Sequence, residues 1–156
     1  MSSIIHKEDR LSLDHFDGEK VLLTDQEWRK KLSPDQYDVL RRKETENAFH
    51  NKYYNLKKHG VYFCAGCSLP LFSSDTKYDS GTGWPSFWEP IIEENISYQK
   101  DASLFSLKTE VLCSRCDGHL GHLFDDGPKP TGKRYCLNSE ALHFEEYLSL
   151  LLLYTL

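Results

Sequence analysis

The two motifs Cys64-Ala65-Gly66-Cys67 and Cys113-Ser114-Arg115-Cys116 decide the fold of this chain. Each C-x-x-C turn can direct two sulfurs at one ion, and four thiolates close a tetrahedral zinc site. Such a site has no open coordination position, so we expect the metal to hold the fold and to take no part in chemistry. The sequence therefore predicts one structural zinc ion. The alternative is a pair of redox-active dithiols, which is less common for two matched pairs in a reducing compartment.

Composition indicates a soluble globular chain with one main domain. The 156 residues are 39% hydrophobic and 28% charged, which is normal for such a protein. The net charge of −5 at pH 7 argues against a nucleic-acid partner, and the densest basic runs alternate with acids on expected helices. No apolar run approaches the ~20 residues that span a bilayer, so we expect no membrane partner.

The N-terminal residues predict the compartment. Residues 1–21 carry five acids and no apolar core, which fits neither a secretory signal nor a transit peptide. We therefore expect a cytoplasmic location, where thiols stay reduced.

We expect three parts along the chain. Residues 1–23 are polar and irregular, which indicates a flexible or loosely docked arm. Residues 24–144 form the domain, and residues 145–156 form an apolar tail. We expect the tail to dock on the domain or on a second subunit. A membrane-surface anchor is the alternative, but the tail lacks the basic face of one.

Two short helices are expected at the start of the domain. Thr24-Asp25-Gln26-Glu27 and Ser33-Pro34-Asp35-Gln36 have capping-box spacing, and proline suits the first helical position. We expect these helices to end at about Lys31 and Lys43.

From Gly60 onward the pattern predicts antiparallel β structure. Short aromatic-rich segments alternate with Gly, Pro, Ser and Asp. The expected strands are Tyr62–Cys64, Leu71–Phe72, Lys77–Tyr78, Ser86–Trp88, Leu104–Cys113 and Tyr135–Leu137. In Leu104–Cys113 one face carries the apolar residues, and Ser106, Lys108 and Glu110 fall on an exposed face. Recurrent glycine and proline over residues 118–132 predict a long ordered loop. The fold class is therefore mainly β (α+β), an antiparallel zinc-pinned β domain with two short N-terminal helices.

The fifth cysteine, Cys136, is the candidate nucleophile. A reactive thiolate needs nearby positive charge, and Arg134 shares its face in a strand-like segment. His119 and His122 are suitable proton donors near neutral pH. A lone cysteine is more often a small buried apolar side chain, so from these residues alone both interpretations stay open.

The segment Gly81-Thr82-Gly83-Trp84-Pro85-Ser86-Phe87-Trp88 is a candidate substrate pocket. Two glycines allow a tight turn and the proline fixes it, so Trp84 could form one wall of a small apolar pocket. Aromatic residues of β domains more often belong to the core, and that alternative also stays open.

Together and in this order, these motifs strongly resemble the B-type methionine sulfoxide reductases. The resemblance covers about Leu23 to Phe144. It rests on the two C-x-x-C motifs and on KYDSGTGWPSF (77–87), HLGHLFDDGP (119–128) and RYCLNS (134–139). It implies a zinc-bearing β fold and reduction of the R epimer of methionine sulfoxide, in peptides or proteins, to methionine.

The resemblance implies catalytic roles for five residues. Cys136 attacks the sulfoxide sulfur and is left as a sulfenic acid, while Arg134 helps to hold its thiolate. His119, His122 and Asn138 match the polar positions of the family and serve the sulfoxide oxygen, with His122 as the leading proton donor.

The resemblance also implies the substrate-binding residues and one departure. Trp84 would cradle the S-methyl group, with Phe124 as a second wall. Many family members have a resolving cysteine where this chain has Thr82, so the chain resembles the one-cysteine subgroup. The sulfenic acid would then be reduced directly by thioredoxin or by another thiol, or by a cysteine borrowed from the zinc site. Direct reduction is favoured, because removing a ligand would cost metal affinity and stability.

Two other classes compete with this interpretation. A non-enzymatic zinc-pinned binding module could use the same aromatic residues, Trp84, Trp88 and Phe124, as a recognition pocket. A thiol-disulfide oxidoreductase could use one C-x-x-C motif. A binding module has no need for Cys136 beside proton donors, and an occupied zinc site would leave no free dithiol.

Overall fold

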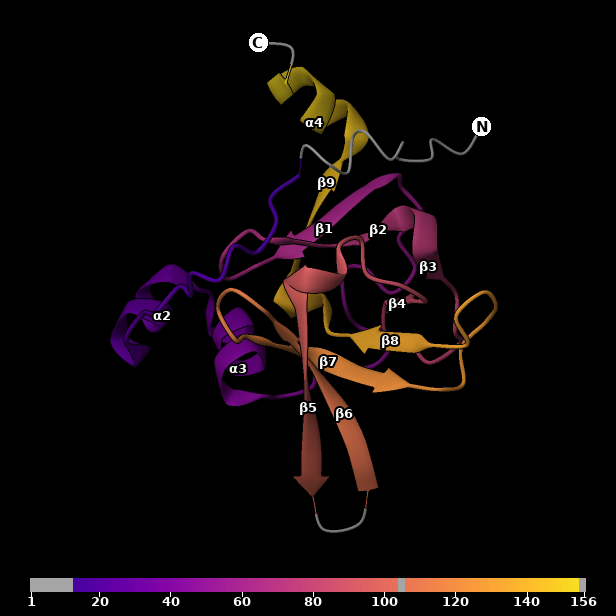
Figure 1. Ribbon diagram of the computed structural model, residues 1–156, viewed down its shortest axis with the longest axis horizontal. Coiled ribbons are helices and arrows are strands. Elements are labelled where there is room, and N and C mark those ends of the chain that lie inside the picture. The colour runs from indigo at the N-terminus through magenta and orange to yellow at the C-terminus, as the bar shows by residue number, and fades with distance from the viewer. Residues whose placement is uncertain (1–12, 104–105, 155–156) are drawn as a thin grey trace.

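The computed structural model describes residues 13–103 and 106–154, and its architecture is mainly antiparallel β, as predicted (Figure 1). One sheet has the strand order β2-β1-β9, and the other has the order β3-β4-β8-β7-β6-β5. The strands are β1 (Gly60–Cys64), β2 (Pro70–Ser73), β3 (Lys77–Tyr78), β4 (Ser86–Phe87), β5 (Ile96–Ser103), β6 (Ser106–Cys113), β7 (His119–Phe124), β8 (Arg134–Leu137) and β9 (Leu142–Glu146). The helices are α2 (Asp25–Lys31), α3 (Pro34–Arg42) and α4 (Tyr147–Tyr154), with 3-10 turns η1 (Ser74–Thr76), η2 (Glu93–Asn95) and η3 (Ser139–Ala141).

The two predicted helices are confirmed, and both begin with the predicted capping boxes. The side chain of Thr24 accepts the amide of Glu27 at the start of α2, and Ser33 does the same at the start of α3. Helix α3 then packs on the second C-x-x-C turn, where Arg41 Nη1 donates to the Cys116 carbonyl oxygen at 2.7 Å. The helices therefore support the cysteine cluster from outside the sheets.

The predicted loop over residues 118–132 is wrong for its first part, which forms β7. This strand is hydrogen-bonded to β6 on one side and to β8 on the other. Gly121 allows the close approach, because a Cβ there would lie 2.0 Å from the Cys136 carbonyl oxygen. In the sequence Gly121 suggests a loop, but in the structure it lies where two paired strands approach each other closely.

The predicted alternation of β6 needs one correction. Val111 and Cys113 are fully buried, as expected for the apolar face. Glu110, expected on the exposed face, is only 2% exposed. The second face is therefore buried at this position, and a buried carboxylate needs partners.

The core between the two sheets fixes the orientation of β8. Tyr62 and Phe72 of the small sheet contact Phe87 of the large sheet at ring distances of 5.1 and 4.7 Å. Tyr135 of β8 joins this cluster at 5.5 Å from Phe72, and Leu137 is 1% exposed. Aromatic pairs of this kind stabilise a core by about 0.5–1.5 kcal/mol each beyond their area burial. The residue between Tyr135 and Leu137 must therefore face away from this core.

The predicted arm of residues 1–23 is described from residue 13 onward, and that part contacts the domain. The Asn95 side chain binds the Phe16 amide at 2.8 Å and the Asp14 carbonyl at 3.0 Å. Lys20 Nζ donates to the Ser114 carbonyl at 2.7 Å. Residues 13–23 are therefore docked beside the second C-x-x-C motif, and residues 1–12 lie outside the described residues.

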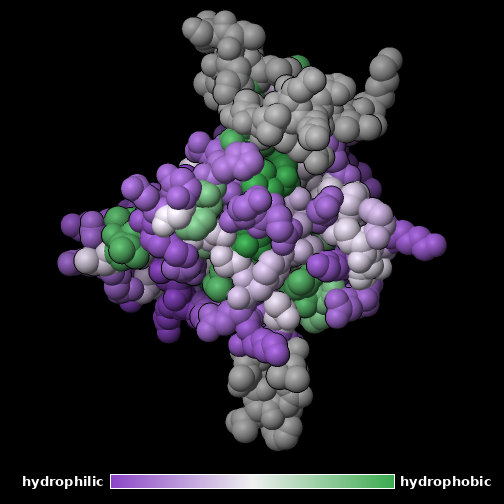
Figure 2. Space-filling view, in the orientation of Figure 1, coloured by the Kyte–Doolittle hydropathy of each residue, from purple (hydrophilic) through white to green (hydrophobic). Residues whose placement is uncertain are grey.

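The predicted tail begins inside β9 and continues as α4. Tyr147 and Leu150 pack against a small cluster that includes Leu13 and Ile91. Within residues 13–103 and 106–154, no helix is long and apolar enough to cross a membrane. Hydrophilic residues cover most of the described surface in the view of Figure 2, and the apolar patches there are separate. The division into arm, domain and tail stays a prediction.

Candidate active site and metal centre

The four cysteines of the two motifs converge as predicted. Their sulfur atoms all lie within 4.8 Å of one another, with Cys64–Cys116 at 3.6 Å and Cys67–Cys113 at 3.4 Å. Zn–S bonds of ~2.3 Å in a tetrahedron separate the sulfurs by about 3.8 Å. The donor set and its spacing therefore fit a zinc ion.

Both C-x-x-C turns have the same backbone structure. The amide of Ser68 donates to the Cys64 carbonyl oxygen at 2.9 Å, and the amide of Asp117 donates to that of Cys113 at 2.9 Å. Ser68 and Asp117 take left-handed conformations, with φ of 65° and 59°. Each motif therefore ends in the same kind of turn, and the hydrogen bond of that turn encloses both of its cysteines.

Cys136 lies in a row of side-chain positions that crosses the large sheet. Cys136 is paired with Ser86 of β4 on one side and with His122 of β7 on the other. His122 is in turn paired with Glu110 of β6. Opposed residues on neighbouring strands point to the same face, so a thiol, an imidazole and a carboxylate follow one another across the sheet.

Groups around the Cys136 thiol act on its pKa in opposite directions. The side chain is half-buried, and burial raises its pKa above the usual value. The charge of Arg134 and hydrogen bonds from Thr82 and Arg134 act in the opposite direction, and Glu46 adds to the increase. The expected influence of Arg134 is present, but burial outweighs it, so the thiol form prevails at neutral pH.

Two predicted residues, Arg134 and Phe124, lie against each other. They are paired across β7 and β8, and the guanidinium carbon lies 4.2 Å from the Phe124 ring centroid. Asp126 holds the guanidinium at 2.8 and 3.1 Å. The face of the Phe124 ring towards Arg134 is therefore occupied, which leaves only the remainder of the ring for a substrate.

His119 is held by a buried carboxylate. Its Nδ1 lies 2.6 Å from Glu110 Oε2, while Lys43 Nζ lies 3.2 Å from Glu110 Oε1. The pKa of His119 is lowered, mainly by burial. The Glu110 carboxylate acts to raise this pKa, and the charge of Lys43 acts to lower it. The neutral ring thus donates Nδ1–H to Glu110, and its buried Nε2 has no hydrogen-bond partner among residues 13–103 and 106–154. The ring meets that of His122 edge-on at 5.3 Å.

Asn138 is buried and bridges two segments. Its Nδ2 donates to the Leu120 carbonyl oxygen at 3.2 Å, and its Oδ1 accepts the Glu46 amide at 3.1 Å. The amide group therefore connects β7 to the loop at Glu46.

Glu46 is a site residue that the sequence did not identify. Its carboxylate accepts the amides of Ser139 and Glu140 at 2.7 and 2.9 Å, at the start of η3. Its carbonyl oxygen accepts the indole N–H of Trp84 at 3.0 Å. One residue thus links the chain after Cys136 to the half-buried Trp84. No periodic or motif signal marks this stretch of the sequence.

Comparisons with known proteins show which family this chain resembles over most of its length. Residues 32–146 match the family model described as "SelR domain". The "Peptide methionine sulfoxide reductase MsrB" of Hahella chejuensis is 56% identical over 126 residues, covering 81% of this chain and 91% of that protein. The protein of the same name from Leptospira interrogans is 53% identical over 127 residues, covering 81% and 97%. A crystal structure of the Mis18 "Yippee-like" domain has a TM-score of 0.44 at 14% identity, over 57% of this chain and 97% of that chain, and no argument rests on it.

Proposed function

The chain belongs to the SelR family of B-type peptide methionine sulfoxide reductases, and we propose that Cys136 is the residue that removes the sulfoxide oxygen. The enzyme reduces the R epimer of methionine sulfoxide in peptides or proteins to methionine. The observation that carries the proposal for the site is the pairing of Cys136 with His122 across β7 and β8.

The first step transfers one oxygen atom. The Cys136 sulfur attacks the sulfoxide sulfur, and the oxygen then bonds to the Cys136 sulfur. The bond from oxygen to the methionine sulfur and the transient sulfur–sulfur bond break, which leaves methionine and a cysteine sulfenic acid. The thiol proton ends on the transferred oxygen, so the step needs no external proton. Because burial raises the pKa of Cys136, a base must take this proton before or during attack.

We assign that proton transfer to His122. It faces Cys136 on the neighbouring strand and can take the thiol proton and return it to the sulfoxide oxygen. The Glu110–His119 pair beside it stabilises the positive charge that His122 carries between these two events. Arg134 stabilises the thiolate in the same interval.

Exchange of the Glu110 charge is expected to change the pH profile. In Glu110→Gln the carboxylate no longer raises the pKa of His119, so the fall in kcat/KM at acidic pH, where His119 takes up a proton, should move to lower pH. We also expect a loss of about tenfold at neutral pH, because the charge on His122 is then less well stabilised. Lys43→Asn should move the profile to higher pH, because Lys43 lowers the same pKa and asparagine tolerates its φ of 59°. If the pH profiles of Glu110→Gln and Lys43→Asn shifted in the same direction, the proposed role of the Glu110–His119 pair would be contradicted.

The proposed substrate pocket uses Trp84, whose indole is fixed by Glu46. An apolar ring held in one orientation can receive the S-methyl group and favour one epimer of the sulfoxide. Phe124 offers the part of its ring that Arg134 does not cover.

The proposed resident metal is a structural zinc ion on Cys64, Cys67, Cys113 and Cys116. When bound, the ion would stabilise the fold. It would take no part in the reaction, because four protein thiolates leave no coordination position for substrate. The reaction steps therefore rest on side chains of β6, β7, β8 and the Trp84 segment.

The proposed reductant of the sulfenic acid is an external thiol such as thioredoxin, in a reducing compartment such as the cytoplasm. Two thiols reduce the sulfenic acid to Cys136 and water and become a disulfide. The other four cysteines of the chain are gathered in the metal centre.

Thr82→Cys is expected to create an internal route. The Thr82 side chain lowers the pKa of Cys136 and is linked through Ser80 to Ser86, the residue paired with Cys136, so we expect a thiol at this position to reach the sulfenic acid. Mass spectrometry after one turnover should find a Cys136 disulfide with the new cysteine in the variant, and a sulfenic acid in the unaltered chain. In the unaltered chain, a disulfide from Cys136 to any zinc-site cysteine would contradict direct reduction.

The function itself is tested with separated epimers. We expect reduction of R but not S N-acetyl-methionine sulfoxide, with dithiothreitol or thioredoxin as reductant. Equal rates on the two epimers would contradict the assignment, and no rate on either would favour a binding module.

A further inference from the structure

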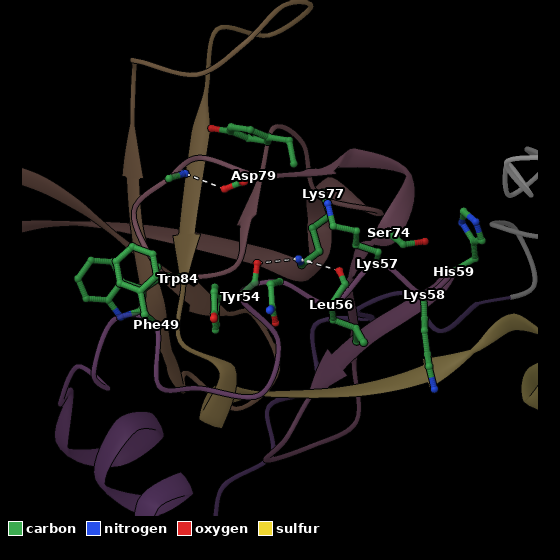
Figure 3. Close-up of a pocket in the computed structure, with 14 residues that line it drawn as sticks. Phe49, Tyr54, Leu56, Lys57, Lys58, His59, Ser74, Lys77, Asp79 and Trp84 are labelled. Atoms are coloured by element: carbon green, nitrogen blue, oxygen red, sulfur yellow. Dashed lines mark hydrogen bonds between the residues drawn. The ribbon is translucent and has the colours of Figure 1, made fainter.

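A cavity of about 440 Å³ lies beside the segment that presents Trp84 (Figure 3). Gly81, Gly83 and Trp84 line one side of it, and Phe49 and Tyr54 add aromatic surface. Thr82, between the two glycines, is linked through Ser80 to Ser86, the residue paired with Cys136. The volume falls within the range of small-ligand sites, about 300–1,000 Å³. A peptide whose sulfoxide reaches Trp84 thus has space for its neighbouring residues here.

The lining is predominantly basic. Lys57, Lys58, His59 and Lys77 contribute to it, against the single carboxylate of Asp79. Asp79 accepts a backbone amide at 2.9 Å, and Lys58 Nζ lies 3.1 Å from Glu146. Lys58 is therefore paired, and among the remaining charged groups Lys57 and Lys77 outnumber the Asp79 carboxylate.

Lys77 is fixed in place. Its Nζ donates to the carbonyl oxygens of Tyr54 at 3.1 Å and Leu56 at 3.0 Å, the two bonds drawn in Figure 3. An ammonium group has three N–H donors, so one remains for another acceptor. Burial and the nearby charge of Lys57 lower its pKa to about 8, although the charge of Asp79 acts in the opposite direction. An anion in the cavity would reduce this repulsion and supply the third acceptor.

We propose that this cavity binds an acidic side chain of the substrate, so that the enzyme prefers methionine sulfoxide with Asp or Glu nearby in the peptide. The proposal rests on the proposed function, because the sulfoxide must enter beside Trp84. Lys57 is exposed and contributes mainly charge, while the half-buried Lys77 contributes a directed hydrogen bond. Since an exposed charge pair contributes up to about 1 kcal/mol, the preference should be about three- to fivefold in kcat/KM.

The test uses three peptides that differ only near the methionine R-sulfoxide. One has Glu two residues before it, one has Glu two residues after it, and the third has Gln at both positions. We expect at least one acidic peptide to exceed the Gln peptide about three- to fivefold in kcat/KM at low ionic strength, and less at high salt. Equal kcat/KM for all three would overturn the proposal. Free N-acetyl-methionine R-sulfoxide tests the proposed function separately, since it has no acidic neighbour to bind.

Charge variants identify the cavity as the origin of the preference. The readout is the ratio of acidic to Gln peptide within each variant, which cancels general changes in activity. Lys57→Gln should reduce the ratio towards one, Lys57→Arg should restore it, and Lys57→Glu should make it less than one. Lys30→Gln, on the exposed surface of α2, should keep the ratio of the unaltered chain. A preference that survives both Lys57→Gln and Lys57→Glu would place the acidic group elsewhere and overturn the proposal.

Discussion

Cys136→Ser should lower the rate of R-sulfoxide reduction by more than about a thousandfold. Sulfur can accept the sulfoxide oxygen and form a sulfenic acid, whereas a serine hydroxyl has no corresponding oxidised state. The assay is methionine formation from the R epimer with dithiothreitol. Nothing else in the proposed mechanism can replace this step, so the effect should exceed that of any exchange at Glu110, Lys43 or Lys57.

The same variant should keep its fold. The serine is nearly the same size as cysteine, and Tyr135 and Leu137 hold β8 in the core whichever residue lies between them. We expect an unchanged thermal transition and an unchanged zinc content. A trap for sulfenic acid should label Cys136 after one turnover in the unaltered chain and nothing in the variant. Full activity of Cys136→Ser would refute the mechanism.

Local signals predicted much of the fold, and the errors have physical causes. The capping boxes at Thr24 and Ser33 act within four residues, so the sequence suffices to identify them. A glycine is required at position 121 because the backbone of β8 at Cys136 lies so close to it. This contact joins two separate strands, so the residues around Gly121 do not reveal it. Strand β5, with the sequence ISYQKDAS, has little apolar periodicity and is held by pairing with β6.

The candidate site shows the same division. Cys136 and His122 were identified from residue type and resemblance, and their pairing is a result of the sheet register. Glu46 and Glu110 were missed because an acid in a loop or on the polar face of a strand indicates exposure. Burial of Glu110 depends on His119 and Lys43, which reach it from other elements. Such partners become visible only when the fold is known.

Removal of one zinc ligand should have the largest effect on stability. We expect Cys116→Ser to lose most of its zinc and to unfold at a much lower temperature than the unaltered chain. Structural zinc ions bind zinc-finger peptides with apparent free energies of about 10–16 kcal/mol, whereas a whole domain is stable by about 5–15 kcal/mol. Cys116 is 3% exposed, and its motif connects β6 to β7, the strand that carries His122. Its loss should therefore lower activity as well, although Cys116 does not contact substrate in the mechanism.

The matched control is again Cys136→Ser, because it makes the same chemical exchange at the fifth cysteine. Zinc content by elemental analysis and thermal unfolding are measured on both variants. Cys136→Ser should keep about one zinc per chain and lose activity, whereas Cys116→Ser should lose zinc and stability. If Cys116→Ser kept its zinc and its transition temperature, the four thiols would not form a structural site, and a dithiol role for one C-x-x-C motif would become the better explanation. If Cys136→Ser lost its zinc, the separation of four structural cysteines from one reactive cysteine would be wrong.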